Sequence, residues 1–323
     1  MRKPVNILIT GIGSTTAISI IKGLKKQKKY AIRIIGVDIH RQNEIAGSSF
    51  CDSYYQIPDA LSKQYVNTLI EIIEKEKIQI LFPVIDIELL VIAQNIRFFK
   101  NKKVTIWLSD YETINICNDK YLTCSFFKKN NIPTPKFWLP NKLNKNYQSL
   151  KFPLIIKPRN GVSSRDVYKI NNCEELDKYV SIVKNSVIQM YIEGTEYTID
   201  VLSDSESNVL SVVPRERIET RAGISYKGKV VANTKLERYG REIAQLLKIK
   251  GPCNIQCIID TSGNLFFIEI NPRFSGSLPL TIASGINGPY ILTNITLGDR
   301  VERKDLIFKK DVYMIRYWEE VFY

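Results

Sequence analysis

Histidine and paired cysteines are scarce in this sequence of 323 residues. His40 is the only histidine, and the six cysteines stand singly, without a CxxC pair. Because structural zinc sites are built from clustered cysteine and histidine ligands, this pattern argues against a zinc site. Cys253 and Cys257 lie on one predicted strand, about 13 Å apart, which is too far for a disulfide. We expect reduced, buried thiols, as in a cytosolic protein.

Long apolar runs, sequence repeats and low-complexity tracts are also missing. Arg2 and Lys3 precede the apolar segment VNILITGIG. Glycine interrupts this segment before it reaches the length of a signal-peptide core or a membrane span. The sequence therefore predicts a cytoplasmic protein without a membrane partner.

Acidic residues are outnumbered, with 33 Asp and Glu against 46 Lys and Arg, which gives a formal net charge of +13. The basic residues form only short runs, such as residues 25–29, and there is no nucleic-acid-binding motif. We therefore expect no nucleic acid partner, but a general attraction for anionic ligands such as nucleotides and acidic substrates. The length predicts two or three domains.

The N-terminal third of the sequence predicts a Rossmann-like α/β domain. Residues 5–10 form a predicted buried strand, a glycine turn and a helix follow, and residues 32–38 form a second strand that ends in an acid. Gly11 and Gly13 match the first two glycines of a dinucleotide-binding fingerprint, but Thr16 replaces the third. Two interpretations stay open: an NAD site, or glycines that only permit a tight turn.

A lysine and a loop further along the chain indicate a phosphate-binding site. Lys157 ends a predicted buried strand, and the loop of residues 160–164 follows, in which Ser163 and Ser164 can present backbone amides to phosphate. Lys120, in a predicted helix that also holds the preceding acid, supplies a second cation, so that two lysines can bracket a triphosphate. The alternative is an ordinary exposed lysine at a strand end.

An apolar strand end and a nearby acid are candidates for a purine pocket. Gln189, Met190, Tyr191 and Ile192 can hold a flat base through main-chain hydrogen bonds, and Glu196 can take the ribose hydroxyls. The alternative is that this segment is simply core.

The segment NIQCIIDTSGNLFFIEINPRFSG predicts a hairpin with hard oxygen ligands at one end. Period-two alternation places Glu269 and Asn271 on one face, and Gln256 comes from the partner strand. Carboxylate and amide oxygens suit Mg²⁺, which takes its remaining ligands from phosphate and water. Arg273 follows at the strand end, where it can meet a transferred phosphoryl group. The alternative is a surface strand with solvated polar residues.

Candidate substrate-binding residues lie in two further places. The first follows the predicted strand IQILFPV, because ligands of open α/β sheets bind outside the carboxyl ends of strands; the acids there, candidates to bind the amine or another polar group, are Asp86 and Glu88. The second is a predicted loop whose basic residues are candidates to bind the substrate carboxylate or an acyl phosphate: Arg215, Arg217, Arg221 and Lys227. A solvated charge run is the alternative for this loop.

The order of these motifs, DK, IIKP, QMYIEGTEYTID, NIQC and FIEINPR, resembles the ATP-grasp superfamily, specifically its carbamoyl-phosphate-synthase-like branch. The resemblance covers essentially the whole chain. It implies an α/β protein, with α+β structure in the nucleotide domain. A Rossmann-like preATP-grasp domain spans residues 1–110, and a two-lobed ATP-grasp fold follows, with a small lobe at 111–187 and a large lobe at 188–323.

The resemblance also implies roles for individual residues. Lys120 and Lys157 correspond to the cations on the nucleotide phosphates, Gln189 to Ile192 to the adenine hinge, and Glu196 to the ribose-contacting acid. The implied magnesium ligands are Gln256, Glu269 and Asn271, with Glu269 bridging two ions, for which Mn²⁺ can substitute. The sequence departs from the family in its phosphate loop, RNGVSSRD, in Gln189, where many relatives have an acid, and at Ser275 or Gly276, where a basic residue is common.

These expectations favour an ATP-dependent ligase that joins a carboxylate to an amine, or to a thiol, through an acyl phosphate, with release of ADP and phosphate. Phosphoryl transfer asks mainly for positioning and charge neutralisation, which magnesium, Lys157, Arg273 and Arg221 can provide without a nucleophilic side chain. Two alternatives stay open: a non-catalytic nucleotide-binding regulatory protein, and an NAD-dependent oxidoreductase. A homodimer is expected, and the two substrates stay unnamed.

Overall fold

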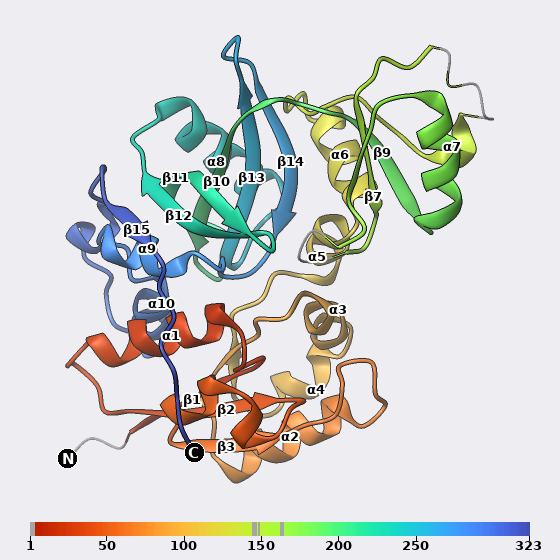
Figure 1. Cartoon of the computed structure of the whole chain (residues 1–323). Coiled ribbons are helices and arrows are strands. Elements are labelled where there is room, and N and C mark those ends of the chain that lie inside the picture. Colours follow the sequence, from red (N-terminus) through yellow and green to blue (C-terminus); the bar gives the residue numbers. More distant parts are fainter. Residues whose placement is uncertain (1–3, 144–146, 148, 162–164) are drawn as a thin grey trace.

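The computed structural model describes residues 4–143, 147, 149–161 and 165–323 (Figure 1). It contains a five-stranded parallel sheet, a four-stranded antiparallel sheet and a six-stranded antiparallel sheet, which follow one another along most of the chain. This arrangement confirms the predicted fold class, α/β with α+β structure in the second part. Within the described residues, no helix is both long enough and apolar enough to cross a membrane.

The N-terminal sheet has the strand order β3-β2-β1-β4-β5, and all neighbouring strands are parallel. Ile7 and Ile9 of the central strand enter one core cluster and Leu8 enters another, so this strand is buried on both faces. Helix α1 covers the first face, and α2 and α3 cover the second. The elements are β1 (Val5–Ile9), α1 (Thr15–Lys26), β2 (Ile32–Asp38), β3 (Ser53–Gln56), α2 (Tyr65–Lys75), β4 (Ile80–Phe82), α3 (Asp86–Gln94), α4 (Ile96–Lys100) and β5 (Thr105–Ile106).

The glycine turn after β1 is a tight strand-to-helix connection. Gly11 has a φ of +55°, and a Cβ at this position would lie 2.4 Å from Cγ1 of Ile85, so both backbone angle and space require glycine. The amide of Gly13 donates a 2.9 Å hydrogen bond to Oδ2 of Asp38. The acid that would bind a ribose in a dinucleotide site is thus bonded to the turn itself. These contacts support the tight-turn interpretation rather than an NAD site.

The helix predicted around Lys120 is broken in two. Asp119 is extended, with φ −107° and ψ 110°, and its side chain accepts hydrogen bonds from the amides of Tyr121 and Leu122, which caps the second helix. The four-stranded sheet that follows has the order β6-β9-β7-β8, and α7 packs on it through Leu176. The elements are α5 (Tyr111–Asn118), α6 (Lys120–Lys129), β6 (Phe137–Trp138), β7 (Leu154–Pro158), β8 (Tyr168–Ile170), α7 (Cys173–Ile182) and β9 (Ser186–Met190).

The six-stranded sheet has the order β14-β13-β10-β11-β12-β15. Helix α8 covers its apolar face, where Leu236 and Ile243 contact the same cluster as Ile199, Ile255 and Phe267. The elements are β10 (Gly194–Ser203), β11 (Val209–Arg221), β12 (Ile224–Val230), α8 (Thr234–Leu246), β13 (Gly251–Asp260), β14 (Leu265–Asn271), α9 (Leu278–Ala283), α10 (Gly288–Thr296) and β15 (Tyr313–Ile315). Short 3₁₀ helices span Gln42–Glu44, Ala46–Phe50, Pro140–Lys142 and Arg303–Leu306.

The arginine-rich segment predicted as a loop is instead a β-hairpin. Strands β11 and β12 pair from Arg215↔Val230 to Arg221↔Ile224, so the arginines belong to an extended ladder. The strand begins with the apolar run VLSVV and continues through the charged residues, whose composition had indicated a loop. Alternation along β11 therefore sends successive charged side chains to opposite faces.

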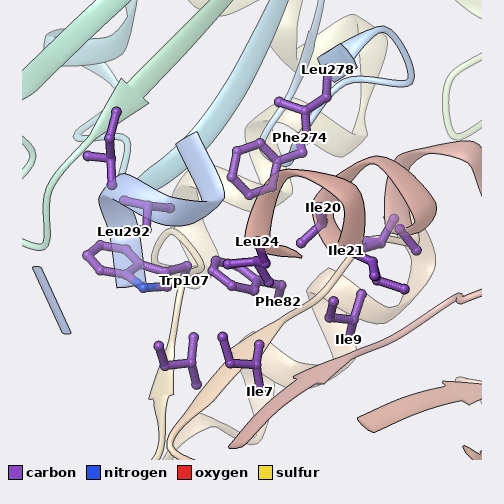
Figure 2. Packing of buried hydrophobic residues seen from close by; sticks show 14 of the residues in the cluster. Ile7, Ile9, Ile20, Ile21, Leu24, Phe82, Trp107, Phe274, Leu278 and Leu292 are labelled. Carbon is purple, nitrogen blue, oxygen red and sulfur yellow. The ribbon is translucent and has the colours of Figure 1, made fainter. Parts of the chain in front are cut away.

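Helices α9 and α10 pack against the N-terminal domain rather than only against their own sheet. Figure 2 shows Phe274, Leu278 and Leu292 in one buried cluster with residues of β1, α1 and β4, including Ile9 and Phe82. The rings of Phe82 and Phe274 have centroids 5.9 Å apart and are inclined at 59°. The chain that follows β14 is therefore fixed to the first domain by a shared core.

The cysteines carry no disulfide in the described residues, and four of the six are buried. The expectation of buried thiols is wrong for Cys173, which is exposed at the start of α7, and Cys51 is only partly buried. Burial raises the pKa of the buried Cys117 and Cys257 thiols, so these groups stay protonated and unreactive at neutral pH.

The shared core predicts a large effect of shortening Phe274, whose exposed fraction is 6%. Phe274→Ala should lower the free energy of unfolding by about 3–5 kcal/mol, because it leaves a cavity between the two parts of the chain. Denaturant unfolding followed by circular dichroism measures this change. Phe322→Ala is the matched control, since Phe322 is 89% exposed and its loss should change stability by less than about 0.5 kcal/mol. Equal effects of the two substitutions would contradict the shared core.

Candidate active site

The six-stranded sheet has one apolar face and one polar face, and the polar face carries the predicted metal ligands. Gln256 pairs across the strands with Glu269, and Asn254 pairs with Asn271. Residues directly opposite one another on neighbouring strands share a face. The structure therefore brings Gln256, Glu269 and Asn271 together, as the alternation in the sequence predicts.

A β-bulge aims Glu269 at this polar face. The pairing between β13 and β14 shifts between Gln256 and Cys257, so that Cys257 pairs with Phe267 rather than with the residue next to Glu269. Phe267 lies in the apolar core, although it stands only two residues before Glu269. In a regular strand these two side chains would share a face, and the bulge separates them.

Asn254 fixes the orientation of Asn271. Nδ2 of Asn271 donates to Oδ1 of Asn254 at 3.2 Å, and Nδ2 of Asn254 donates to the carbonyl oxygen of Arg273 at 3.1 Å. With its nitrogen engaged in this way, the amide of Asn271 has its oxygen left as the atom that could bind a metal. Asn254 was not among the predicted site residues, although its place two residues before Gln256 on the same strand could have indicated it.

The two predicted phosphate-binding lysines, on α6 and β7, lie within range of each other's charge. Lys157 is buried on β7, so the alternative of an exposed lysine at a strand end is wrong. Burial lowers the pKa of Lys157, and the nearby carboxylate of Glu269 opposes this shift. Lys120, the first residue of α6, donates from Nζ to the carbonyl oxygen of Gly161 at 2.7 Å.

The start of the phosphate loop is clamped to the junction of α5 and α6. Asp119 accepts from Nε of Arg159 at 3.1 Å and 3.0 Å and from Nη2 at 2.5 Å, a bidentate ion pair. The amide of Lys120 donates to the carbonyl oxygen of Arg159 at 3.0 Å. Ser163 and Ser164 lie outside the described residues, and their contribution stays a prediction.

The predicted base-binding segment spans the end of β9 and the connection to β10. Nε2 of Gln189 donates to Sγ of Cys124 at 3.0 Å, and the amides of Met190 and Tyr191 donate to the carbonyls of Lys136 and Pro153. These two N–H groups are therefore committed within the protein and do not face a ligand, contrary to expectation. Ile192 follows in the connection, and Glu196, on β10, is exposed.

The predicted substrate-binding arginines have three different environments. Arg215 is 1% exposed, and its Nη2 donates to Asp200 at 2.6 Å and to Ser275 at 2.9 Å. The expectation that Arg215 binds substrate is therefore wrong, because its charge is neutralised inside the protein. Arg221 is exposed at the hairpin end, where it pairs with Glu219 and lies over the ring of Tyr226. This position does not support the expected catalytic role for Arg221.

Arg217 is the arginine of β11 that contacts the predicted metal ligand Gln256 on the polar face of the sheet. Its Nη1 donates to Oε1 of Gln256 at 3.1 Å and lies 3.5 Å from the carboxylate of Glu196. Burial lowers the pKa of Arg217, while Glu196 and Glu269 oppose the shift. Because Gln256 already accepts from a cation, it is a weaker candidate ligand for Mg²⁺ than Glu269 or Asn271. Lys227, by contrast, pairs with Glu219 at 2.8 Å in the hairpin.

Arg273 is held by an acid of the N-terminal domain. Its Nε and Nη2 each donate at 2.7 Å to one carboxylate oxygen of Asp86, the first residue of α3. Although burial alone would lower the pKa of Arg273, Asp86 and Glu269 raise it above its ordinary value. The sequence predicted both residues at the site but not this contact between them.

Glu88 has a structural role instead of the expected substrate contact. Its side chain is 3% exposed, and its carboxylate accepts from the amides of Val84 and Ile85 and from the hydroxyls of Thr10 and Tyr65. Burial raises the pKa of Glu88, against these hydrogen bonds. The expectation that Glu88 binds substrate is wrong, because all these contacts fix the start of α3 below the cleft.

A cleft lies where these elements meet. Its lining includes Asp86 from the N-terminal domain, Lys120 and Gly161 from the phosphate-loop region, and Glu269 and Asn271 from the six-stranded sheet. Within the described residues, no group of three His, Cys, Asp or Glu side chains could hold a metal by itself. The carboxylate of Glu269 and the amide oxygen of Asn271 fit Mg²⁺ bound together with phosphate oxygens, while the second carboxylate of the lining, Asp86, is paired with Arg273.

Comparison with known proteins agrees with this geometry. The family described as PylC-like, N-terminal domain, matches residues 7–107, and the family described as ATP-grasp domain matches residues 117–277. The carbamoyl phosphate synthase large chain of Clostridium acetobutylicum is 28% identical over 235 residues, which cover 67% of this chain and 22% of that protein. The chain thus spans about a fifth of the length of the curated relatives that it matches.

Solved structures show the same fold over nearly the whole chain. The biotin carboxylase domain of the Hydrogenobacter thermophilus 2-oxoglutarate carboxylase, a dimer in complex with MgADP, ADP and bicarbonate, has a TM-score of 0.76 at 18% identity and covers 97% of this chain and 74% of that one. An L-amino acid ligase from Bacillus licheniformis has a TM-score of 0.69 at 18% identity, covering 92% and 75%. With both family matches in the predicted order, the chain belongs to the ATP-grasp superfamily.

Proposed function

We propose that this protein is an ATP-dependent ligase that activates a carboxylate with the γ-phosphoryl group of ATP and joins it to an amine. The observation that supports this most strongly is that Lys120, Glu269 and Asn271 line one cleft, while Lys157 and Arg273 lie within range of the Glu269 charge. The carboxylate of Glu269 favours the charged form of both Lys157 and Arg273, so one acid of the sheet acts on two cations. Such a site suits a magnesium–triphosphate complex and an anionic substrate.

The nucleotide would lie between the four-stranded and the six-stranded sheets, with its phosphates at Lys120 and Lys157. Glu269 and Asn271 would hold magnesium. Gln256 is a third proposed ligand, and Glu269 would also be shared with a second magnesium ion. Magnesium would supply neutralisation of the charge on the β- and γ-phosphates. Glu196 and the segment from Gln189 to Ile192 are the proposed contacts for ribose and base.

The chemistry needs no nucleophilic side chain of the protein. A carboxylate oxygen attacks the γ-phosphorus, the bond from this phosphorus to ADP breaks, and an acyl phosphate forms. The amine nitrogen then attacks the acyl carbon, the carbon–oxygen bond to phosphate breaks, and the nitrogen loses a proton. In this scheme Lys157 and Arg273 stabilise the negative charge that moves onto the phosphoryl and leaving oxygens. A thiol acceptor would follow the same steps.

Two of the similar proteins have names that refer to carboxylates, bicarbonate or amino acids: the 2-oxoglutarate carboxylase domain in complex with bicarbonate and the L-amino acid ligase. This chemistry supports a small carboxylate as the activated substrate. A non-catalytic nucleotide-binding protein would use the same lysines for the phosphates, and turnover separates it from the ligase.

ADP release in the presence of panels of carboxylic acids tests the proposal. With hydroxylamine as the acceptor, an acyl phosphate should be trapped as a hydroxamate, and ADP and hydroxamate should form in equal amounts. Colorimetric hydroxamate detection and a coupled ADP assay measure the two products. Absence of both across broad panels of acids, for a protein that binds Mg-ATP, would contradict the ligase and favour the regulatory alternative.

Glu269→Gln provides the matching test of the metal site. Because the amide lacks the charge that Mg²⁺ needs, this variant should lose the magnesium-dependent part of its ATP affinity, and any ADP formation should fall by about 100-fold or more. Calorimetric titration of ATP with and without Mg²⁺ measures the first effect. Glu206→Gln makes the same chemical change in an exposed turn and should behave as wild type. Unchanged magnesium dependence in the Glu269 variant would exclude this residue as the ligand.

A further inference from the structure

The ion pair between Asp86 and Arg273 closes the cleft from the N-terminal side, and it joins residues 187 positions apart in the chain. The pair uses the Nε and Nη2 edge of the guanidinium, which is the edge that binds a carboxylate in the two-pronged mode. The remaining nitrogen, Nη1, donates to the carbonyl oxygen of Phe274 at 3.1 Å. The strongest carboxylate-binding edge of Arg273 is therefore already occupied by a carboxylate of the protein.

Arg273 cannot easily move away from this place. Its own carbonyl oxygen accepts a hydrogen bond from Asn254, and the next residue, Phe274, is buried against Phe82 in the shared core. The backbone of Arg273 is therefore fixed beside the cleft, and the bond from Nη1 to the carbonyl of Phe274 holds the guanidinium close to it.

Asp86 is fixed at its backbone but not at its side chain. Glu88 accepts the amides of Val84 and Ile85 and so holds the chain just before α3. The Asp86 side chain itself is 17% exposed and lines the cleft, and among the described residues its carboxylate bonds only to Arg273. A rotation about its Cα–Cβ bond separates the pair without moving the helix.

We propose that Asp86 occupies the oxyanion-binding edge of Arg273 in the substrate-free protein and that an incoming oxyanion displaces it. The ligand class is a carboxylate or a phosphoryl group, which share the geometry that Asp86 shows. The inference rests on the proposed function, and it makes Asp86 a positioning residue that holds Arg273 ready. The N-terminus of α3 adds to the preference for an anion at this place.

The displacement has a structural consequence. The ion pair is a direct polar link between α3 and the end of β14, so an oxyanion that replaces Asp86 changes the contact between the N-terminal domain and the six-stranded sheet. Binding of an oxyanion at Arg273 would thereby change the contact between Arg273 and α3, which forms the N-terminal side of the cleft.

Titration of inorganic phosphate and of acetate into the full-length protein tests the proposal, because it needs no knowledge of the natural substrates. The titrations are run with and without saturating MgADP and followed by calorimetry. Asp86→Asn should bind at least one of the two anions about 10-fold more tightly than wild type, since the competing carboxylate is gone. Tighter binding of acetate indicates that this edge of Arg273 binds the substrate carboxylate, and tighter binding of phosphate indicates that it binds the phosphoryl group.

Three further variants make the result specific. Asp86→Glu keeps the competing charge and should bind both anions as weakly as wild type. In the double variant D86N/R273M the gain should disappear, which separates Arg273 from the two lysines. Asp110→Asn removes another ion pair, 2.8 Å long, between the end of the N-terminal domain and Lys250, and it should leave anion affinity unchanged.

Anion affinity in Asp86→Asn that is unchanged or weaker than in wild type would overturn the proposal. Asp86→Ser removes the same charge, so it decides the question if the asparagine variant does not fold. Failure of wild-type protein to bind MgADP would instead contradict the nucleotide site of the proposed function. The comparison of anion affinities without nucleotide decides the role of Asp86 in that case as well.

Discussion

The arrangement of the cleft depends on the attachment of one short segment, residues 271–275, to both halves of the molecule. Asn254 holds the carbonyl of Arg273 from within the six-stranded sheet, while Phe274 packs on Phe82 of the N-terminal domain. The same segment carries the candidate metal ligand Asn271 and the arginine that pairs with Asp86. A site made from two domains needs such a fixed point, because its side chains otherwise move with the domains. The apolar core shown in Figure 2 provides it.

The division of the six-stranded sheet into an apolar and a polar face explains how one hairpin can serve both stability and chemistry. Ile255, Cys257 and Phe267 pack under α8, while Gln256 and Glu269 from the same two strands face the cleft. The bulge beside Gln256 is what allows Phe267 and Glu269 to face opposite ways. Because Glu269 stands on a rigid sheet, its carboxylate keeps its position without closure of a loop.

Much of this could be predicted from the sequence, because it follows from short-range patterns. Alternation places Glu269 and Asn271 together, the apolar run before Lys157 predicts its strand, and the order of the motifs indicates the family. The arginine-rich hairpin was missed, because charges in β11 hide the strand pattern that its apolar beginning starts. The break at Asp119 was missed for a similar reason, since a capping acid is also compatible with a helix interior.

Other features depend on contacts between distant parts of the chain, which no local pattern records. The burial of Glu88 among Thr10, Tyr65 and the start of α3 is one example, and the neutralisation of Arg215 by Asp200 is another. The pairing of Asp86 with Arg273 is the third, and it decides how the cleft is closed on the N-terminal side. By sequence, each of these charged residues was a reasonable substrate ligand. Only the contacts that each makes in the fold show whether it is free to bind a substrate.

The central claim is that one cleft, built from the sheet end and the N-terminal domain, holds magnesium and the nucleotide phosphates. A crystal structure of the protein soaked with Mg²⁺ and a non-hydrolysable ATP analogue tests it most directly. The account predicts a metal ion on the carboxylate of Glu269 and the amide oxygen of Asn271, with the phosphates facing Lys120 and Lys157. A nucleotide bound instead at the Gly11 turn of the N-terminal domain, with Glu269 free of metal, would contradict it.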